Sequence, residues 1–168
     1  PDMSTFGKII GGGMPVGAYG GKKEIMEVVA PLGPVYQAGT LSGNPVAMAA
    51  GLAQLTYLKD HPEIYDHLNH LGQKLYGGLS DIVKMAKAEC TINHIGSIGT
   101  IFFTGDEVTD YTSAKKSDLT KYTDYFLHML NHGNYFAPAQ YEAMFISNAH
   151  TSENINTTLE AAAKFFRV

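Results

Sequence analysis

The stretch NPVAMAAGLAQLTYLKDHPEIYDHLNHLGQKLYGGLSDIV, residues 44–83, decides the fold because it predicts two successive helices. Asn44 is a good N-cap and Pro45 suits the first helical position, so the first helix begins here. Its alanines are small enough to let a neighbouring element pack closely. His61-Pro62 ends it, and a long amphipathic helix follows. The apolar residues of this second helix recur at helical spacing: Ile64, Leu68, Leu71, Leu75, Leu79, Ile82 and Val83.

The first 43 residues are organised by the backbone rather than by side-chain packing. Seven glycines lie between Gly7 and Gly21, and they alternate with apolar residues instead of the serines of a flexible linker. We expect a strand near residues 5–10, a tight glycine turn, a second strand near 16–19 and a helix that begins near Lys22. Residues 33–43 are expected to form a loop.

The pattern changes again near Cys90. Residues 90–105 read as two short strands joined at Gly96-Ser97, and residues 117–132 as a helix stopped by Gly133. Two short extended pieces follow within residues 135–150, and then a terminal helix capped by Thr151 or Ser152. Strands and helices in this order form a small α+β unit. The chain is therefore predicted to divide near residues 60–65, with an α/β part over 1–62 and an α+β domain over 63–168.

Composition limits the possible partners. The net charge of −4 gives no reason to expect nucleic acid or an anionic membrane surface, and no apolar run reaches the ~18 residues of a membrane span. A single cysteine, Cys90, excludes an internal disulfide and favours a reducing, cytoplasmic setting. We expect this thiol to be buried and inert.

Lys8 is the first candidate for chemistry, because it stands alone between a polar lead and the glycine-rich turn. An amine attacks a carbonyl carbon only when it is neutral, and burial in a tight site lowers the pKa of a lysine. From the residues alone, a solvated lysine at the end of a strand remains the alternative.

Gly39 and Thr40 form a second candidate. A threonine hydroxyl and backbone N–H groups, placed just ahead of a helix, are suited to bind a phosphate. The alternative is an ordinary loop threonine. A metal site is not expected: His128 and His132 are four residues apart, but Met129 stands where a zinc-protease motif has glutamate, and no third ligand is evident.

Long motifs carry a family resemblance. GKIIGGGMPVGAYGG (residues 7–21) followed by YQAGTLSGNPVAMAAG (36–51) resembles the pyridoxal-phosphate aminotransferases of fold type I, class III. Within that group, AKKSDLTKYTDYFLHMLNHGNYFAP (114–138) and QYEAMFISNAHT (140–151) resemble the glutamate-1-semialdehyde 2,1-aminomutases. These enzymes convert glutamate-1-semialdehyde to 5-aminolevulinate for tetrapyrrole synthesis, using pyridoxal and pyridoxamine phosphate.

The resemblance implies a fold and a place in a longer enzyme. Residues 1–62 would be the end of the large α/β cofactor domain, and residues 63–168 the small α+β carboxy-terminal domain. The chain would be roughly the last two fifths of the subunit of a longer enzyme. That enzyme would be a cytoplasmic homodimer. The aspartate that pairs with the cofactor's ring nitrogen and the mobile gating loop would lie outside this chain.

The resemblance also implies roles for individual residues. Lys8 would be the Schiff-base lysine, and Gly39 and Thr40 would bind the cofactor phosphate of the partner subunit. Glu142 would lie at the substrate end of the site, where the alternative from the residues alone is a solvated carboxylate. This chain has Ala139, Tyr141 and Met144 where serine, phenylalanine and glycine are common in the family.

Two alternatives to the aminomutase remain open. One is a class III transaminase that uses another amino donor, because it would need the same lysine and threonine. The other is an inactive fragment that acts only as a folded or interaction domain, because 168 residues without the ring-nitrogen aspartate would bind the cofactor poorly.

Overall fold

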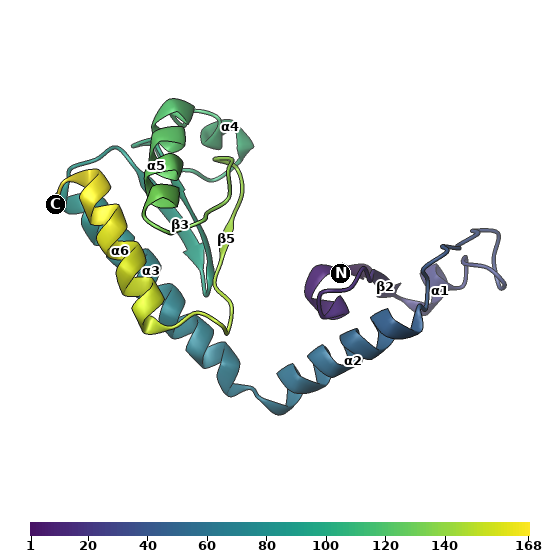
Figure 1. The fold of residues 1–168 in the computed structure, drawn as a ribbon. Coiled ribbons are helices and arrows are strands. Elements are labelled where there is room, and N and C mark those ends of the chain that lie inside the picture. The colour runs from purple at the N-terminus through teal and green to yellow at the C-terminus, as the bar shows by residue number, and fades with distance from the viewer. The chain divides into compact units, whose positions relative to one another are not determined.

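The computed structural model describes residues 1–168 as two compact units, Pro1–Pro62 and Glu63–Val168. Figure 1 shows the order of elements along the chain. The first unit contains β1 (Met3–Phe6), η1 (Lys8–Gly11), β2 (Ala18–Gly21), α1 (Lys23–Met26) and α2 (Pro45–Asp60). The second contains α3 (Glu63–Met85), β3 (Thr91–Ile95), β4 (Ile98–Phe102), α4 (Tyr111–Ala114), α5 (Leu119–Asn131), β5 (Met144–Phe145) and α6 (Ser152–Phe166).

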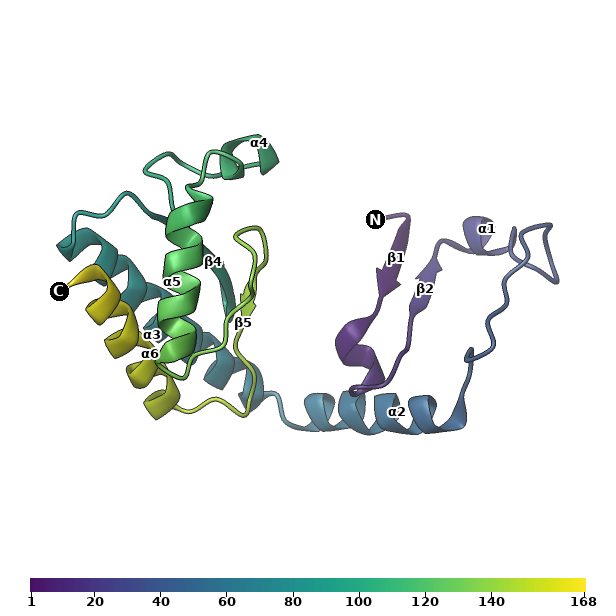
Figure 2. The same ribbon diagram turned by 45° about the horizontal axis from the view of Figure 1, so that its top comes forward.

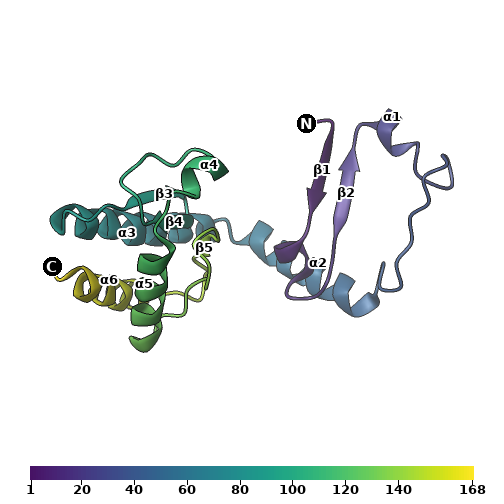
Figure 3. The same cartoon turned by 90° about the horizontal axis from the view of Figure 1, so that it is seen from above.

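In the first unit, β1 and β2 form an antiparallel ribbon, side by side in Figure 3, with Met3 opposite Gly21 and Phe6 opposite Ala18. The predicted strand over residues 5–10 is wrong in its extent, because β1 ends at Phe6 and a 3₁₀ turn follows. Lys8 and Gly12 have φ angles of 54° and 57°, which an extended strand does not accommodate. The second strand lies two residues later than predicted.

Helix α2 supports this turn. Its predicted start is confirmed: the Asn44 side chain accepts hydrogen bonds from the backbone N–H groups of Val46 and Ala47, at 3.1 and 3.2 Å. Figure 2 shows η1 seated on this helix. The contact requires a glycine, because a Cβ at Gly51 would collide with the carbonyl oxygen of Ile10. The loop predicted over residues 33–43 contains no helix or strand.

In the second unit, a three-stranded antiparallel sheet has the order β3-β4-β5. The long helix, the first two strands, the helix before Gly133 and the capped terminal helix are all confirmed. The structure adds the short α4, and it forms only one two-residue strand where two extended pieces were predicted. The short β5 pairs with β4 only at Ile98 and Gly99, so the rest of that β4 edge has no strand partner.

The hydrophobic core of the second unit is built on α3, which lies beside α6 in Figures 1 and 3. Its predicted apolar face is confirmed, with Leu71 and Leu79 fully buried. Aromatic rings close the core: Tyr125 of α5 lies 5.5 Å from Phe103 and 5.2 Å from Phe165 of α6, measured between ring centroids. None of the helices combines the length and the apolar composition that a membrane crossing needs.

Candidate active site

Lys8 opens the 3₁₀ turn η1 in a left-handed backbone conformation. Such a conformation costs a residue with a Cβ about 1–2 kcal/mol. Two other residues with positive φ, Lys87 and Arg167, lie within two residues of the C-terminal ends of α3 and α6, where left-handed residues are common. Lys8 is instead the first residue of its turn. Its strain is therefore not explained by helix capping and marks a candidate functional position.

An open hollow of about 810 Å³ lies at Lys8, with walls made by Gly7 to Ile9 and Gly13 to Val16. The lysine is exposed, and nothing lies within 4 Å of the position that a Cβ on Gly13 would take. A planar ring can therefore approach the backbone beside the amine. The hollow offers a reachable amine beside an open backbone position at Gly13, which suits a group that bonds to lysine.

Gly39 and Thr40 lie in a tight turn just before α2. The backbone N–H of Ser42 donates to the Gly39 carbonyl at 2.9 Å, and the N–H of Asn44 donates to Leu41 at 3.1 Å. Both candidate residues are exposed, and neither lines the hollow at Lys8.

Glu142 belongs to the second unit, in the irregular segment between α5 and β5. Its backbone is held: its N–H donates to the carbonyl of Ala139 and its carbonyl accepts from the Thr100 hydroxyl, both at 3.2 Å. Its side chain is exposed. Burial, and secondly the charge of the Glu142 carboxylate, raise the pKa of Tyr122. Glu142 thus presents a charged, accessible carboxylate from an anchored backbone.

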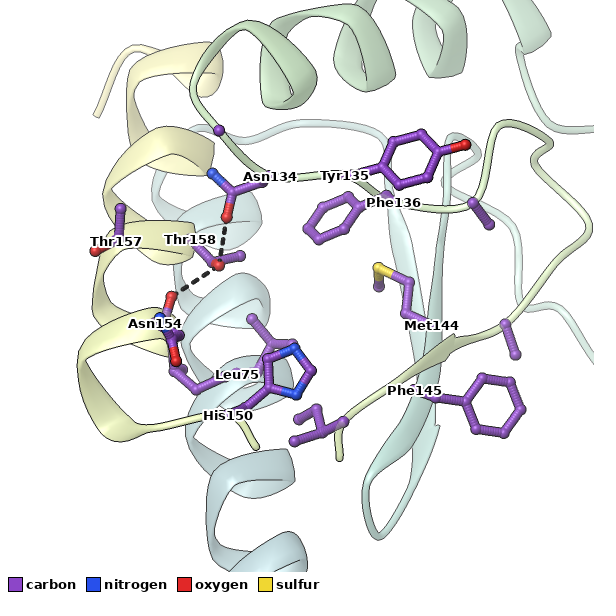
Figure 4. Close-up of a pocket in the computed structure, with 15 residues that line it drawn as sticks. Leu75, Asn134, Tyr135, Phe136, Met144, Phe145, His150, Asn154, Thr157 and Thr158 are labelled. Carbon is purple, nitrogen blue, oxygen red and sulfur yellow. Dashed lines mark hydrogen bonds between the residues drawn. The ribbon is translucent and has the colours of Figure 1, made fainter. Parts of the chain in front are cut away.

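A second hollow, of about 450 Å³, lies in the unit Glu63–Val168 and is drawn in Figure 4. None of Lys8, Gly39, Thr40 and Glu142 lines it. The hydroxyl of Thr158 points to its own neighbours, 2.6 Å from the side-chain oxygen of Asn134 and 2.9 Å from the carbonyl of Asn154. The Thr158 hydroxyl in this hollow therefore already has partners within the chain.

Other reactive side chains are engaged or protected. The Nε2 atom of His128 lies 2.9 Å from the carbonyl of Ala161, and the Nδ1 atom of His132 lies 2.8 Å from the carbonyl of His128. Cys90 is partly exposed, so its expected burial is only partial. Burial is still sufficient to raise the pKa of this thiol to about 12, which keeps it protonated near neutral pH.

Comparison with known proteins identifies the family. The family model described as aminotransferase class-III matches residues 1–164. The chain belongs to the class III aminotransferases. This class III chain is 55% identical over 168 residues to a protein named glutamate-1-semialdehyde 2,1-aminomutase 2 from Lachnoclostridium phytofermentans, and it covers 39% of that relative. Other curated relatives at 51 to 60% identity are also named glutamate-1-semialdehyde 2,1-aminomutase.

Solved structures agree with the assignment. A β-phenylalanine aminotransferase from Variovorax paradoxus superposes with a TM-score of 0.88 at 31% identity, over 98% of this chain and 38% of the other. A transaminase with PLP bound superposes with a TM-score of 0.82 at 25% identity, over 99% of this chain and 38% of the other. The predicted fold, that of a class III aminotransferase, is thereby confirmed, and the chain spans about two fifths of the length of its relatives.

Proposed function

We propose that the protein carrying this chain is a glutamate-1-semialdehyde 2,1-aminomutase, which forms 5-aminolevulinate for tetrapyrrole synthesis in the cytoplasm. One observation carries the proposal: an exposed lysine, held in a strained turn among glycines, lies in a chain that is 55% identical to an enzyme of that name. The substrate is glutamate-1-semialdehyde, and the cofactor is pyridoxal phosphate, with pyridoxamine phosphate as its amine form.

Lys8 is the residue proposed to hold the cofactor. When bound, pyridoxal phosphate withdraws electrons from the carbon next to the substrate nitrogen and so makes its hydrogen acidic. The Lys8 amine would bond to the cofactor at rest and, once displaced, would move a proton between the substrate carbon and the cofactor. The open space at Gly13, in the wall of the hollow, leaves room for the ring beside the amine.

Gly39 and Thr40 are proposed to bind the phosphate of a cofactor held by the partner subunit of a homodimer. Their absence from the hollow at Lys8 supports this division of roles, because a threonine that served the same chain's cofactor would be expected at that hollow. The Thr40 hydroxyl and the backbone N–H groups of this turn can donate to phosphate oxygens.

Glu142 is proposed to contact the substrate. A carboxylate accepts hydrogen bonds from an amino group and stabilises its protonated form. The exposed position of this side chain leaves it available to a ligand.

The test is covalent trapping of the cofactor in the full-length protein. Borohydride reduction and peptide mapping are expected to label Lys8, and Lys8→Ala is expected to abolish the visible absorption of the bound cofactor. Lys23→Ala serves as the control, because this lysine is exposed and pairs only with Glu27 at 3.6 Å. A label on any other lysine would contradict the assignment.

A second candidate is a class III transaminase with a separate amino donor, favoured by the 31% identity to a β-phenylalanine aminotransferase. Turnover of glutamate-1-semialdehyde without any added donor decides for the aminomutase, and strict dependence on a donor decides for the transaminase. For the 168-residue chain alone, titration with pyridoxal phosphate tests whether it is an inactive fragment, which would show no saturable binding.

A further inference from the structure

Gln140 is the most deeply buried polar side chain of the second unit, with 2% of its surface exposed. A primary amide is costly to bury unless its donor and acceptor atoms are both paired. Here both are paired with β4 and the residue after it: Nε2 donates to the carbonyl of Ile101 at 2.7 Å, and Oε1 accepts from the N–H of Phe103 at 3.3 Å.

The two backbone groups lie on the edge of β4 that β5 leaves open. Residues 99, 101 and 103 alternate along the strand and direct their backbone groups to the same side, and only Gly99 of these faces β5. The Gln140 amide therefore occupies the place where a further strand residue would bond. We call these two hydrogen bonds of the Gln140 side chain the clamp, because they take the place of strand pairing at this edge.

The clamp holds the segment that carries Glu142. This segment is anchored at Ala137, whose carbonyl accepts from the Tyr122 hydroxyl at 2.6 Å, at Gln140 itself, and at Glu142, whose carbonyl accepts from Thr100. All three anchors restrain the backbone, and the Glu142 carboxylate is left exposed. The central anchor is the only one that is fully buried.

We propose that Gln140 is a positioning residue, whose amide on the open edge of β4 sets the location of the Glu142 carboxylate relative to the substrate's amino group. This inference rests on the proposed role of Glu142. A displacement of about 1 Å at a positioning group can cost on the order of 100-fold in rate.

The test is a double-mutant cycle in the full-length protein, measured as kcat and KM for the aminomutase substrate. Gln140→Met keeps the length of the side chain and removes both hydrogen bonds, and we expect kcat/KM to fall about 10- to 100-fold. Glu142→Gln removes the carboxylate. The double variant is expected to be no slower than Glu142→Gln, because Gln140 acts only through that side chain.

The possible outcomes separate the two proposals. Unchanged kcat/KM in Glu142→Gln would remove the role of Glu142, and this inference with it, without affecting the trapping result at Lys8. A loss in Glu142→Gln that is absent from Gln140→Met, or two losses that multiply in the double variant, would overturn the positioning role alone.

Two further readouts separate positioning from general stability. Amide hydrogen exchange of residues 137–143 is expected to accelerate in Gln140→Met, while α3 stays protected and the cofactor band is retained. The matched control is Thr158→Val, which removes the side-chain contact of another buried polar residue, the one to Asn134, and is expected to leave kcat/KM unchanged. An equal fall of kcat/KM in this control would contradict the inference.

Gln140→Glu provides a conservative rescue and guards against a variant that does not fold. A glutamic acid donates to Ile101 only when it is protonated, and burial favours the protonated form. Activity relative to the wild type is therefore expected to rise from about pH 9 to about pH 6 in Gln140→Glu and to stay flat in Gln140→Met. A flat ratio in both variants would overturn the inference.

Discussion

At Lys8, a lysine takes a backbone conformation that ordinarily belongs to glycine. A glycine there would relieve the strain, so the lysine lowers the local stability by about 1–2 kcal/mol. The neighbouring glycines at positions 7, 12 and 13 carry no side chains, and Gly12 and Gly13 adopt the positive φ angles that complete the turn. Residue-scale strain of this kind is typical of sites where a side chain must reach a ligand.

Two tyrosines of α5 provide a residue-scale prediction for stability. The hydroxyl of Tyr125 is buried without a hydrogen-bond partner, whereas that of Tyr122 donates to Ala137 at 2.6 Å. We expect Tyr125→Phe to raise the free energy of unfolding by about 1 kcal/mol and Tyr122→Phe to lower it by about 1 kcal/mol. Urea denaturation of both variants measures this, and a loss of stability in Tyr125→Phe equal to that in Tyr122→Phe would show that its hydroxyl is paired.

At the element scale, two of the three glycines inside α3 lie where a neighbouring element approaches the helix closely. A Cβ at Gly72 would collide with the carbonyl oxygen of Gly96 in the β3–β4 turn, and one at Gly78 would lie 2.7 Å from the Leu159 side chain of α6. Gly77 faces open space, with nothing within 4 Å. The three glycines of this helix therefore differ in how much space surrounds them.

An alanine series tests this arrangement. Gly77→Ala is expected to raise the free energy of unfolding by about 1 kcal/mol, because alanine is the better helix former. Gly72→Ala is expected to lower it by about 1–3 kcal/mol, because the backbone at Gly96 must move. Gly78→Ala should lie between them, since a flexible leucine can yield. The order of the three urea midpoints checks the prediction, and destabilisation by Gly77→Ala would contradict it.

At the scale of the whole molecule, the two units differ in how much core they contain. Of the buried hydrophobic residues, only Ala47 belongs to Pro1–Pro62, and all the others lie in Glu63–Val168. The first unit exposes large apolar side chains on α2, among them Val46, Leu52 and Leu55. A two-stranded ribbon of this kind is marginally stable without further packing.

This difference predicts how the 168-residue chain behaves alone. We expect slow amide hydrogen exchange in α3, α5 and α6 and fast exchange throughout residues 1–62, because local stability follows the density of buried apolar contacts. In the full-length protein, residues 1–62 should become protected as well. Comparable protection of α2 and α3 in the isolated chain would show that the first unit is stable by itself.

The sequence alone predicted those features that depend on neighbours in the chain. Asn44 and Pro45 mark the start of α2, the apolar spacing from Ile64 to Val83 predicts α3, and Thr151 caps α6, because caps and amphipathic periodicity are local signals. The motifs around Lys8 predicted the class III family, which the family match confirms. The roles of Lys8, Gly39, Thr40 and Glu142 stay predictions.

Tertiary structure decided what depends on contacts between distant residues. The turn at Lys8 replaces the end of the predicted strand because its backbone is left-handed and because α2, some 40 residues later, supports it through Gly51. The burial of Gln140 against residues 101 and 103 has no local signal, because a glutamine in an irregular segment is usually solvated. Whether a polar side chain is exposed or clamped depends on which strand edge remains open, and only the folded sheet determines that.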